Sequence, residues 1–220
     1  MILGIQTAQK PNGLALVDTN GAPLATLSHD NGRRFGDTLV EQAHALCEQV
    51  GKTFNDIEAI GVVTGPGGYT AVRVGVALAN SVSLVTGCPV YGIDTLAAMA
   101  QPYCAIPGTA LVMTPTLGTQ IAIQLMGFHT NGINPLTPLD VIDAATLANT
   151  LGNVSGNLYI IGGLPEPIAT LNNSALIRIQ TLPDARIVAQ WAAQQFKQEA
   201  PSHAWVSAYY AYEAVAAPSR

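Results

Sequence analysis

Three short apolar segments open the chain and are separated by polar turns. Residues 2–5, 14–17 and 24–27 carry mostly apolar side chains, and the turns between them are rich in Asn and Gly. Turns this short join antiparallel strands, because parallel strands need a much longer crossover. The pattern therefore predicts a three-stranded antiparallel meander.

Helical and strand periodicities then alternate up to about residue 100. Apolar side chains keep helical spacing over residues 37–50, where Asp37 is a candidate N-terminal cap. The segments that follow predict a strand, a long helix, a strand and a short helix, at residues 57–63, 71–86, 90–93 and 94–100. The order βββαβαβα favours a mixed five-stranded sheet with helices on its faces, as in a ribonuclease-H-like unit.

The second half repeats this order in a shorter form. Strands are expected at residues 110–113, 121–126, 159–161 and 176–179, and helices at 139–151 and 184–199. The helices are led by aspartates that suit a helix N-terminus, namely Asp140, Asp143 and Asp184. Two prolines and a glycine in residues 101–108 indicate a boundary. The predicted fold class is α/β, with two tandem ribonuclease-H-like subdomains at 1–101 and 102–220, the second trimmed.

A glycine-rich loop between the strand at 57–63 and the long helix is the most informative segment. It consists of Gly65, Pro66, Gly67, Gly68, Tyr69 and Thr70. Glycines leave the amides of such a loop and of the first helical turn unblocked, which is the geometry of an anion site. The alternative interpretation is a tight turn that lets the helix pack against the strand, because the lysine of a G-x-x-x-x-G-K-[ST] phosphate loop is missing.

The helix behind the loop carries small residues at every fourth position. Ala71, Gly75, Ala79 and Ser83 share one face, so another helix could approach it closely. A glycine in mid-helix costs about 1 kcal/mol relative to alanine, which calls for a packing reason. We therefore interpret this stripe as a docking face. Arg73 has three alternative roles, which are to neutralise a buried carboxylate, to contact a partner, or to remain solvated.

Composition narrows the function classes. Only 10% of the residues are charged and the formal net charge is −5, so no broad basic surface is expected to grip nucleic acid unaided. Cys47, Cys88 and Cys104 form no C-x-x-C pair and are interpreted as small buried residues of a cytoplasmic protein. The sequence shows no signal peptide and no apolar run long enough to span a membrane.

Candidate catalytic chemistry is sparse. His29, His44, His129 and His203 are scattered without metal-binding spacing, and no G-x-S-x-G nucleophile motif occurs. Helix capping accounts for the aspartates, Asp94 among them. Arg33 and Arg34 suit a solvated loop, and the aromatic tail from Trp205 to Tyr212 suits packing over a subdomain seam, because a stacking platform for RNA would need adjacent cations. We expect no catalytic, cofactor or metal site.

A family resemblance covers residues 1 to about 100. The segment from Thr64 to Ala77 resembles the G-P-G-S-F-T-G-x-R-x-G-x-A signature of the TsaB (YeaZ) family, a branch of the actin-like and Hsp70 superfamily. Residues 2–8 resemble its I-L-A-I-D-T-A opening, and residues 89–93 resemble its I-P-V-I-G-V strand. The chain departs from the family at Gln6, where an aspartate is usual, and at residues 35–39 and 114–117, where H-S-E-x-L and D-A-R are usual. A neutral amide at Gln6 weakens the case for a magnesium-nucleotide site.

The resemblance implies a subunit of the bacterial machinery that adds threonylcarbamoyl to the adenosine next to the anticodon of tRNA. Such a subunit has no activity of its own, docks on a catalytic paralogue (TsaD-like) beside an ATPase subunit (TsaE-like), meets tRNA only indirectly, and forms a homodimer when alone. The alternative is an actin-like ATPase or small-molecule kinase.

The docking surface is predicted on the helices at 37–50 and 71–86. The residues assigned to it are Leu39, Ala43, Leu46, Ala71, Val72, Arg73, Gly75, Val76, Ala79, Val82 and Ser83.

Overall fold

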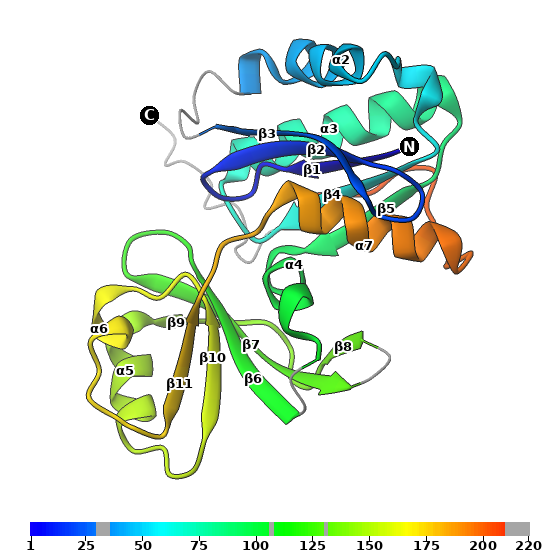
Figure 1. Cartoon of the computed structure of the whole chain (residues 1–220). Coiled ribbons are helices and arrows are strands. Elements are labelled where there is room, and N and C mark those ends of the chain that lie inside the picture. The colour runs from blue at the N-terminus through cyan, green and yellow to red at the C-terminus, as the bar shows by residue number, and fades with distance from the viewer. Residues whose placement is uncertain (30–35, 106–107, 130–131, 210–220) are drawn as a thin grey trace, which may run out of the picture.

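The chain folds around two β-sheets (Figure 1). The structure is a computed structural model that describes residues 1–29, 36–105, 108–129 and 132–209. The loop residues Arg33 and Arg34 and the tail residues Tyr210 and Tyr212 lie outside the described residues.

The first sheet is the predicted mixed sheet of five strands. Its order is β3-β2-β1-β4-β5, with β1, β2 and β3 antiparallel and β4 and β5 parallel to β1. The strands are β1 (Ile2–Gln6), β2 (Asn12–Val17), β3 (Pro23–His29), β4 (Ala59–Gly65) and β5 (Val90–Asp94). The meander and both parallel crossovers are therefore as the hydrophobic pattern predicts.

Helices cover both faces of this sheet. On one face lie α2 (Leu39–Gln49), the short helix η1 (Phe54–Asp56) and α3 (Tyr69–Thr86), which pack on Leu3 and Ile5 of β1. On the other face α7 (Ala185–Lys197) packs on Ile2 and its neighbours (Figure 1). Because successive side chains of a strand point to opposite faces, β1 supplies both cores and every residue of β1 and β2 is buried.

The second sheet follows after residue 107. Its order is β11-β10-β6-β7-β8, and β9 pairs with β7. The strands are β6 (Gly108–Pro115), β7 (Gln120–His129), β8 (Gly132–Pro135), β9 (Asp140–Asp143), β10 (Leu158–Gly162) and β11 (Leu176–Gln180). One face carries α5 (Ala144–Gly152) and α6 (Glu166–Ala169), which close a core around Met113 and Ile160.

One helix from each half of the chain packs on the sheet of the other half. The helix α4 (Thr95–Ala100), followed by η2 (Gln101–Tyr103), comes after β5 but places Leu96 and Met99 in the core of the second sheet. Conversely, α7 comes after β11 but packs on β1, β2 and β4 of the first sheet. The division into residues 1–101 and 102–220 stays a prediction, and α7 returns across it.

Three local predictions are wrong. The N-terminal cap position of α2 is Thr38 rather than Asp37, because Gly36 and Asp37 are already helical and a turn at Thr38 separates them from α2. Residues 139–143 are not helical, since Asp140 to Asp143 form β9 beside β7, and α5 starts only after Asp143. The short strand β8 was not expected. Asp94, Asp143 and Asp184 do cap their helices, each accepting a hydrogen bond from a backbone N–H of the first turn.

Candidate functional site

The glycine loop is packed against the chain's own backbone. The N–H of Gly68 donates to the carbonyl of Ala8 at 2.9 Å, and the hydroxyl of Thr95 donates to the carbonyl of Pro66 at 2.6 Å. Gly65 has φ 113°, and a side chain there would collide with the carbonyl of Tyr209. A side chain at Gly67 would likewise collide with the carbonyl of Ala8. Backbone therefore approaches Gly65 and Gly67 too closely for a side chain, which favours the packing interpretation over a phosphate cradle.

Gln6 stands where the superfamily usually has an aspartate, and its amide is fully buried. Its Nε2 donates to the carbonyls of Gln9 and Pro11, both at 2.8 Å, and of Pro183 at 3.2 Å, while its Oε1 accepts from the N–H of Gln9 at 3.1 Å. A carboxylate cannot donate, so an aspartate or glutamate here would face three carbonyl oxygens. The amide ties the first loop to the entry of α7.

The same loop reaches the second sheet. The Nε2 of Gln9 donates to the hydroxyl of Thr114 and, at 3.2 Å, to the carbonyl of Pro115. These contacts hold the end of β6 against the loop that follows β1. The Gln9 amide thus bridges the first loop and the end of β6 in the second sheet.

Gly75 of α3 also has an internal reason. A side chain there would run into the side chain of Thr7, which is itself buried. The small-residue stripe does permit a close approach, as predicted, but the segment that approaches is the loop after β1 of the same chain.

The predicted docking residues are mostly inside the protein. Nine of them are buried, namely Leu39, Ala43, Leu46, Val72, Gly75, Val76, Ala79, Val82 and Ser83. Ala71 is half-buried and Arg73 is exposed. Their burial leaves little of these nine side chains for a partner to contact in this conformation. The assignment of these residues, and of α2 and α3, to a partner surface stays a prediction.

The outer faces of the same helices carry exposed apolar side chains that the sequence analysis missed. Leu84 is 86% exposed and Val85 79% exposed at the end of α3, and Val40 is 58% exposed on α2. Near the start of α3 the Arg73 guanidinium lies over the Tyr69 ring at 5.4 Å and donates to its hydroxyl. Helical spacing places Leu84, Val85 and Val40 on the outer faces once the small-residue stripe is assigned to the core.

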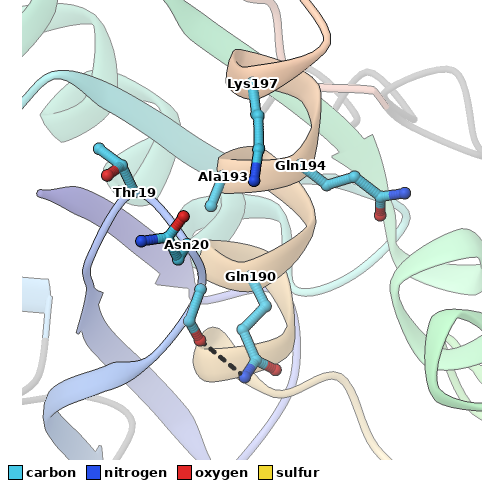
Figure 2. A pocket seen from close by; sticks show the side chains of 7 residues that line it. Thr19, Asn20, Gln190, Ala193, Gln194 and Lys197 are labelled. Atoms are coloured by element: carbon cyan, nitrogen blue, oxygen red, sulfur yellow. Dashed lines mark hydrogen bonds between the residues drawn. The ribbon is translucent and has the colours of Figure 1, made fainter.

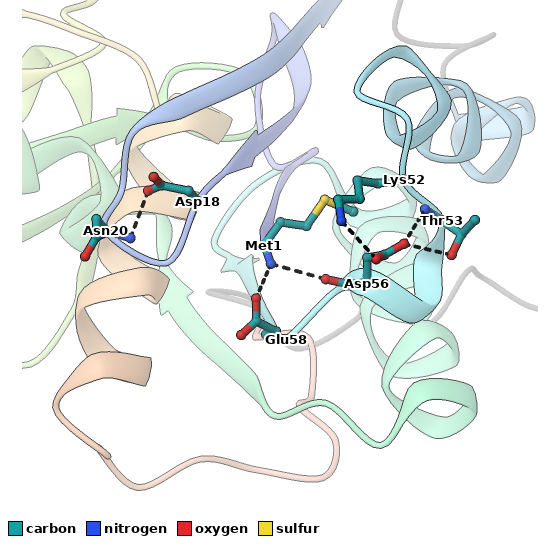
Figure 3. A network of polar contacts seen from close by, with 7 residues as sticks. All are labelled: Met1, Asp18, Asn20, Lys52, Thr53, Asp56 and Glu58. Carbon is teal, nitrogen blue, oxygen red and sulfur yellow. Dashed lines mark hydrogen bonds and ion pairs between the residues drawn. The ribbon is translucent and has the colours of Figure 1, made fainter.

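A polar network fixes the base of the first sheet (Figure 3). Asp56 accepts from the N–H of Thr53 at 2.9 Å and pairs with the Lys52 ammonium at 3.3 Å. The Thr53 backbone contributes most to holding the pKa of Asp56 below its usual range. The amino group of Met1 pairs with Glu58 and donates to the carbonyl of Asp56. These contacts tie the N-terminus of β1 to η1 and to the segment before β4.

The buried titratable groups behave as core residues. Burial, with a smaller effect of Asp56, raises the pKa of the Cys47 thiol to about 11, and burial also raises that of Cys88. Burial raises the pKa of Asp94, the cap of α4. Cys104 is half-buried rather than buried. Within the described residues, no three His, Cys, Asp or Glu side chains gather into a metal-binding group.

A shallow hollow of about 300 Å³ lies between the β2–β3 turn and α7 (Figure 2). Gln190 crosses it and donates to the carbonyl of Gly21 at 3.1 Å. Lys197 is the single charged residue of its lining, and the other lining residues are Thr19, Asn20, Gly21, Gln190, Ala193 and Gln194. One solvated lysine among amides and a hydroxyl gives this hollow little means to hold a charged substrate.

Trp205 and Tyr209, the described aromatic residues of the predicted tail, do not pack over a subdomain seam. Trp205 is 67% exposed and Tyr209 is exposed as well, whereas Val206 between them is buried against the first sheet. Residues 203–209 therefore contact the first sheet and α3 through their backbone and one valine. None of the described helices combines the length and the apolar character needed to cross a bilayer.

Known proteins with a similar sequence act on tRNA. The family model described as TsaD, tRNA N6-adenosine threonylcarbamoyltransferase, matches residues 30–118. A tRNA N6-adenosine threonylcarbamoyltransferase of Burkholderia ambifaria is 30% identical over 174 residues, which is 72% of this chain and 48% of the relative. The same enzyme of Ehrlichia chaffeensis is 35% identical over 114 residues, which is 46% of this chain and 33% of the relative. The chain thus spans about half the length of the Burkholderia relative and about a third of the length of the Ehrlichia relative.

Solved structures decide the fold. YeaZ from Pseudomonas aeruginosa superposes with a TM-score of 0.72 at 15% identity, covering 90% of this chain and 92% of that one. This chain has the YeaZ fold. A second crystal structure, of a protein described as similar to the peptidase YeaZ from Pseudomonas aeruginosa, superposes with a TM-score of 0.71 at 14% identity. The resemblance to the TsaB (YeaZ) family is thereby confirmed at the level of the fold, with its two ribonuclease-H-like subdomains.

Proposed function

We propose that this YeaZ-fold chain is a non-catalytic subunit of the machinery that forms threonylcarbamoyladenosine in tRNA. It acts in the cytoplasm as the docking partner of a catalytic TsaD-like paralogue, beside a TsaE-like ATPase subunit, and meets tRNA only through them. The similarity to threonylcarbamoyltransferases and the fold of YeaZ support the pathway.

The observation that carries the non-catalytic role is the buried amide of Gln6. Its Nε2 faces three backbone carbonyls, so the position that would orient metal and phosphate is occupied by structural hydrogen bonds. The glycine loop also supports a non-catalytic role, because the N–H of Gly68 donates to the carbonyl of Ala8 rather than to a ligand.

The partner surface of this proposal is the outer face of α2 and α3. Leu84 and Val85 at the end of α3 and Val40 on α2 are exposed apolar residues, and interface cores are depleted of charge. The same face serves a homodimer when the partner is absent. Replacing Leu84 and Val85 by aspartate should weaken capture of the TsaD-like partner by at least about tenfold, since two desolvated carboxylates would enter the interface. A matched change at exposed Leu117 on the second sheet should leave capture unchanged.

Depletion of the chain from cells tests the pathway. Mass spectrometry of nucleosides from bulk tRNA should show loss of threonylcarbamoyladenosine, and expression of the wild-type chain should restore it. Restoration should fail with the double aspartate variant of Leu84 and Val85 and succeed with Leu117→Asp. Unchanged nucleoside levels after depletion would refute the proposal.

Calorimetry tests the rival function, an actin-like ATPase or small-molecule kinase. Titration of ATP with magnesium into the pure wild-type chain should release no heat of tight binding. Magnesium-dependent binding followed by ATP turnover would show that the rival is correct, whatever the result of the depletion experiment.

A further inference from the structure

The outer edge of β5 is open beside one glycine. The N–H of Ile60 in β4 donates to the carbonyl of Pro89 at 3.0 Å. Because every second residue of a strand faces the same neighbouring strand, the backbones of Val90 and Gly92 face away from β4. The outward direction of Val90 is visible in its pairing, since it exchanges two backbone hydrogen bonds with His203, at 3.1 and 3.2 Å.

Gly92 keeps both of its outward backbone groups free. The C-terminal segment bends across α3 instead of continuing along β5, because the side-chain amide of Asn80 holds Val206 there. The Nδ2 of Asn80 donates to the carbonyl of Val206 and its Oδ1 accepts from the N–H, both at 2.9 Å. In the part of the chain that the structure describes, nothing bonds the N–H or the carbonyl of Gly92, which is exposed. One donor and one acceptor therefore stand side by side at this edge.

Gly92 lines a hollow of about 490 Å³, a volume in the range of small-molecule sites. Trp205 lines it too, with 67% of its surface exposed. Thr64 and Ser207 add hydroxyl groups and His203 adds an imidazole. The described lining contains no lysine, arginine, aspartate or glutamate, and its other residues are Ala204 and Val206. The hollow thus combines an aromatic ring with uncharged hydrogen-bonding groups and the free backbone of a glycine.

This lining favours a flat and uncharged ligand. An exposed indole stacks on other π systems, and it accepts any nucleobase because every base has a π face. The free N–H and carbonyl of Gly92 suit an edge that carries an acceptor next to a donor, which nucleobases present. A phosphate group, in contrast, would meet no lysine or arginine in the described lining. The lining therefore suits a nucleobase better than it suits a nucleotide or an RNA backbone.

We propose that the hollow at Gly92 and Trp205 binds the base of a free nucleoside. The base stacks on the Trp205 ring, and its edge donates to the carbonyl of Gly92 and accepts from the N–H of Gly92. Binding needs neither magnesium nor turnover, which distinguishes it from the ATPase rival. The site shares no residue with the proposed partner surface and does not depend on the proposed function.

Magnetic resonance spectra of the isotope-labelled, full-length chain test the site, with adenosine as the ligand. Adenosine should shift the amide signal of Gly92 and the indole signal of Trp205 in a saturable way. The indole signal of Trp191 should stay in place, because Trp191 belongs to α7 on the opposite face of the sheet. If neither Gly92 nor Trp205 shows a saturable shift, the proposal is wrong.

Two matched variants test the stacking. Trp205→Ala should weaken adenosine binding by at least about fivefold, since stacking on an aromatic ring contributes a large part of the affinity for a base. Leu117→Ala removes another exposed apolar side chain, outside the hollow, and should leave binding unchanged. Because the Trp205 side chain is largely exposed, its removal should not unfold the chain, and the dispersion of the amide signals checks this. Unweakened binding to Trp205→Ala would overturn the proposal.

Changes to the ligand test the edge and the charge. An adenosine analogue with two methyl groups on its exocyclic nitrogen keeps the ring but loses the donor for Gly92, so it should bind about threefold more weakly or worse. Equal binding of this analogue would contradict the assignment to Gly92. Adenosine monophosphate should bind no more tightly than adenosine. Tighter binding of the monophosphate, or of a single-stranded oligoribonucleotide, that is lost in Trp205→Ala would overturn the assignment to a free nucleoside.

Discussion

The two faces of the first sheet meet their helices in different ways. On one face α3 carries the glycine, Gly75, and this glycine makes room for the side chain of Thr7. On the other face the strands carry the glycines, Gly4 and Gly61, and α7 lies directly on them. A side chain at Gly4 would lie 2.7 Å from Ala189, and one at Gly61 would lie 2.7 Å from Ala192 and from the carbonyl of Val188.

The two faces differ in which atoms can move to relieve a collision with an added side chain. A threonine side chain can rotate to relieve a collision, whereas a helix backbone cannot move without displacing α7 along its length. The α7 face should therefore tolerate substitution less well than the α3 face, and four measurements test this ranking.

The largest effect is expected for Gly4→Ala and Gly61→Ala. Each should lower the free energy of unfolding by about 3 kcal/mol or more, because the added methyl meets α7 backbone and alanine methyls. Urea denaturation measures the change. Gly152→Ala, at the end of α5, adds the same methyl where its nearest neighbour lies 3.9 Å away, and it should not destabilise the protein. Equal losses for all three variants would contradict the comparison.

The next effect is expected for Gln6→Glu, at the entry to the α7 face. At neutral pH the carboxylate would face three carbonyls in a fully buried place, with an expected loss of about 3 kcal/mol. Burial would raise the pKa of this glutamate in the folded state, so the loss should be largest above that pKa and shrink as the pH falls through it. Unfolding curves between pH 4 and 8 check the sign. Gln6→Met, which removes the charge and the donor together, separates the two causes, and a pH-independent loss in Gln6→Glu would contradict the explanation.

A smaller loss is expected for Gly75→Ala on the α3 face, about 1–2 kcal/mol. The obstacle is the Thr7 side chain, so the double variant Gly75→Ala and Thr7→Ala should recover most of the loss. Thr7→Ala alone should cost little, because the Thr7 hydroxyl has no hydrogen-bond partner among the described residues. A double-mutant cycle by denaturation gives the coupling, and a coupling of zero would show that Gly75 is not placed by Thr7.

The smallest effect is expected from Asp56, beneath the α2 and α3 layer. Its pKa is lowered in the folded protein, chiefly by the Thr53 N–H, from an ordinary value of 3.8. Its contribution to stability is therefore fully present above the unfolded pKa and is lost as the pH falls through the folded pKa. Asp56→Asn should flatten the fall of the thermal midpoint below about pH 4 and change little at neutral pH. An acid transition identical to that of the wild type would contradict this assignment.

The sequence predicts the first sheet well because its signals are local. The turns between β1, β2 and β3 are too short for any other pairing, and the glycine loop separates a strand from a helix of opposite periodicity. In the second sheet, the spacing of residues 139–151 predicts a helix throughout. The strand β9 forms at the start of this segment because it pairs with β7, and that pairing is not visible in the local pattern.

The position of α7 could not be predicted from its pattern. The helical spacing of residues 184–199 favours a stripe of Ile187, Val188, Trp191, Ala192 and Phe196, yet the three largest of these are only partly buried. The buried stripe instead consists largely of alanines, which bring the helix close to Gly4 and Gly61. An amphipathic pattern shows that a helix has an apolar face, but it does not show which sheet that face covers.

The sequence locates Gln6 and the stripe on α3 as points of interest, but it does not show which groups these residues contact. The amide at Gln6 was visible in the sequence, and a weakened case for nucleotide binding stays a prediction. The carbonyl acceptors of this amide were not all visible, since Pro183 is remote in sequence and comes near only because α7 returns to the first sheet. The stripe on α3 suggested a partner, whereas within the chain Thr7 lies against Gly75, and Ser83 donates to the carbonyl of Ala204.

The return of α7 also sets the order in which this protein can be completed as it leaves the ribosome. Residues 1–101 emerge first, but the face of their sheet that holds Gly4 and Gly61 has no cover until residues 185–197 have been made. Domains usually fold in the order of their synthesis, and an uncovered apolar sheet face is a target for chaperones. In this chain the strands made first are therefore the last to be covered by a helix. We expect the first sheet to remain unfolded in a nascent chain that stalls within the second sheet.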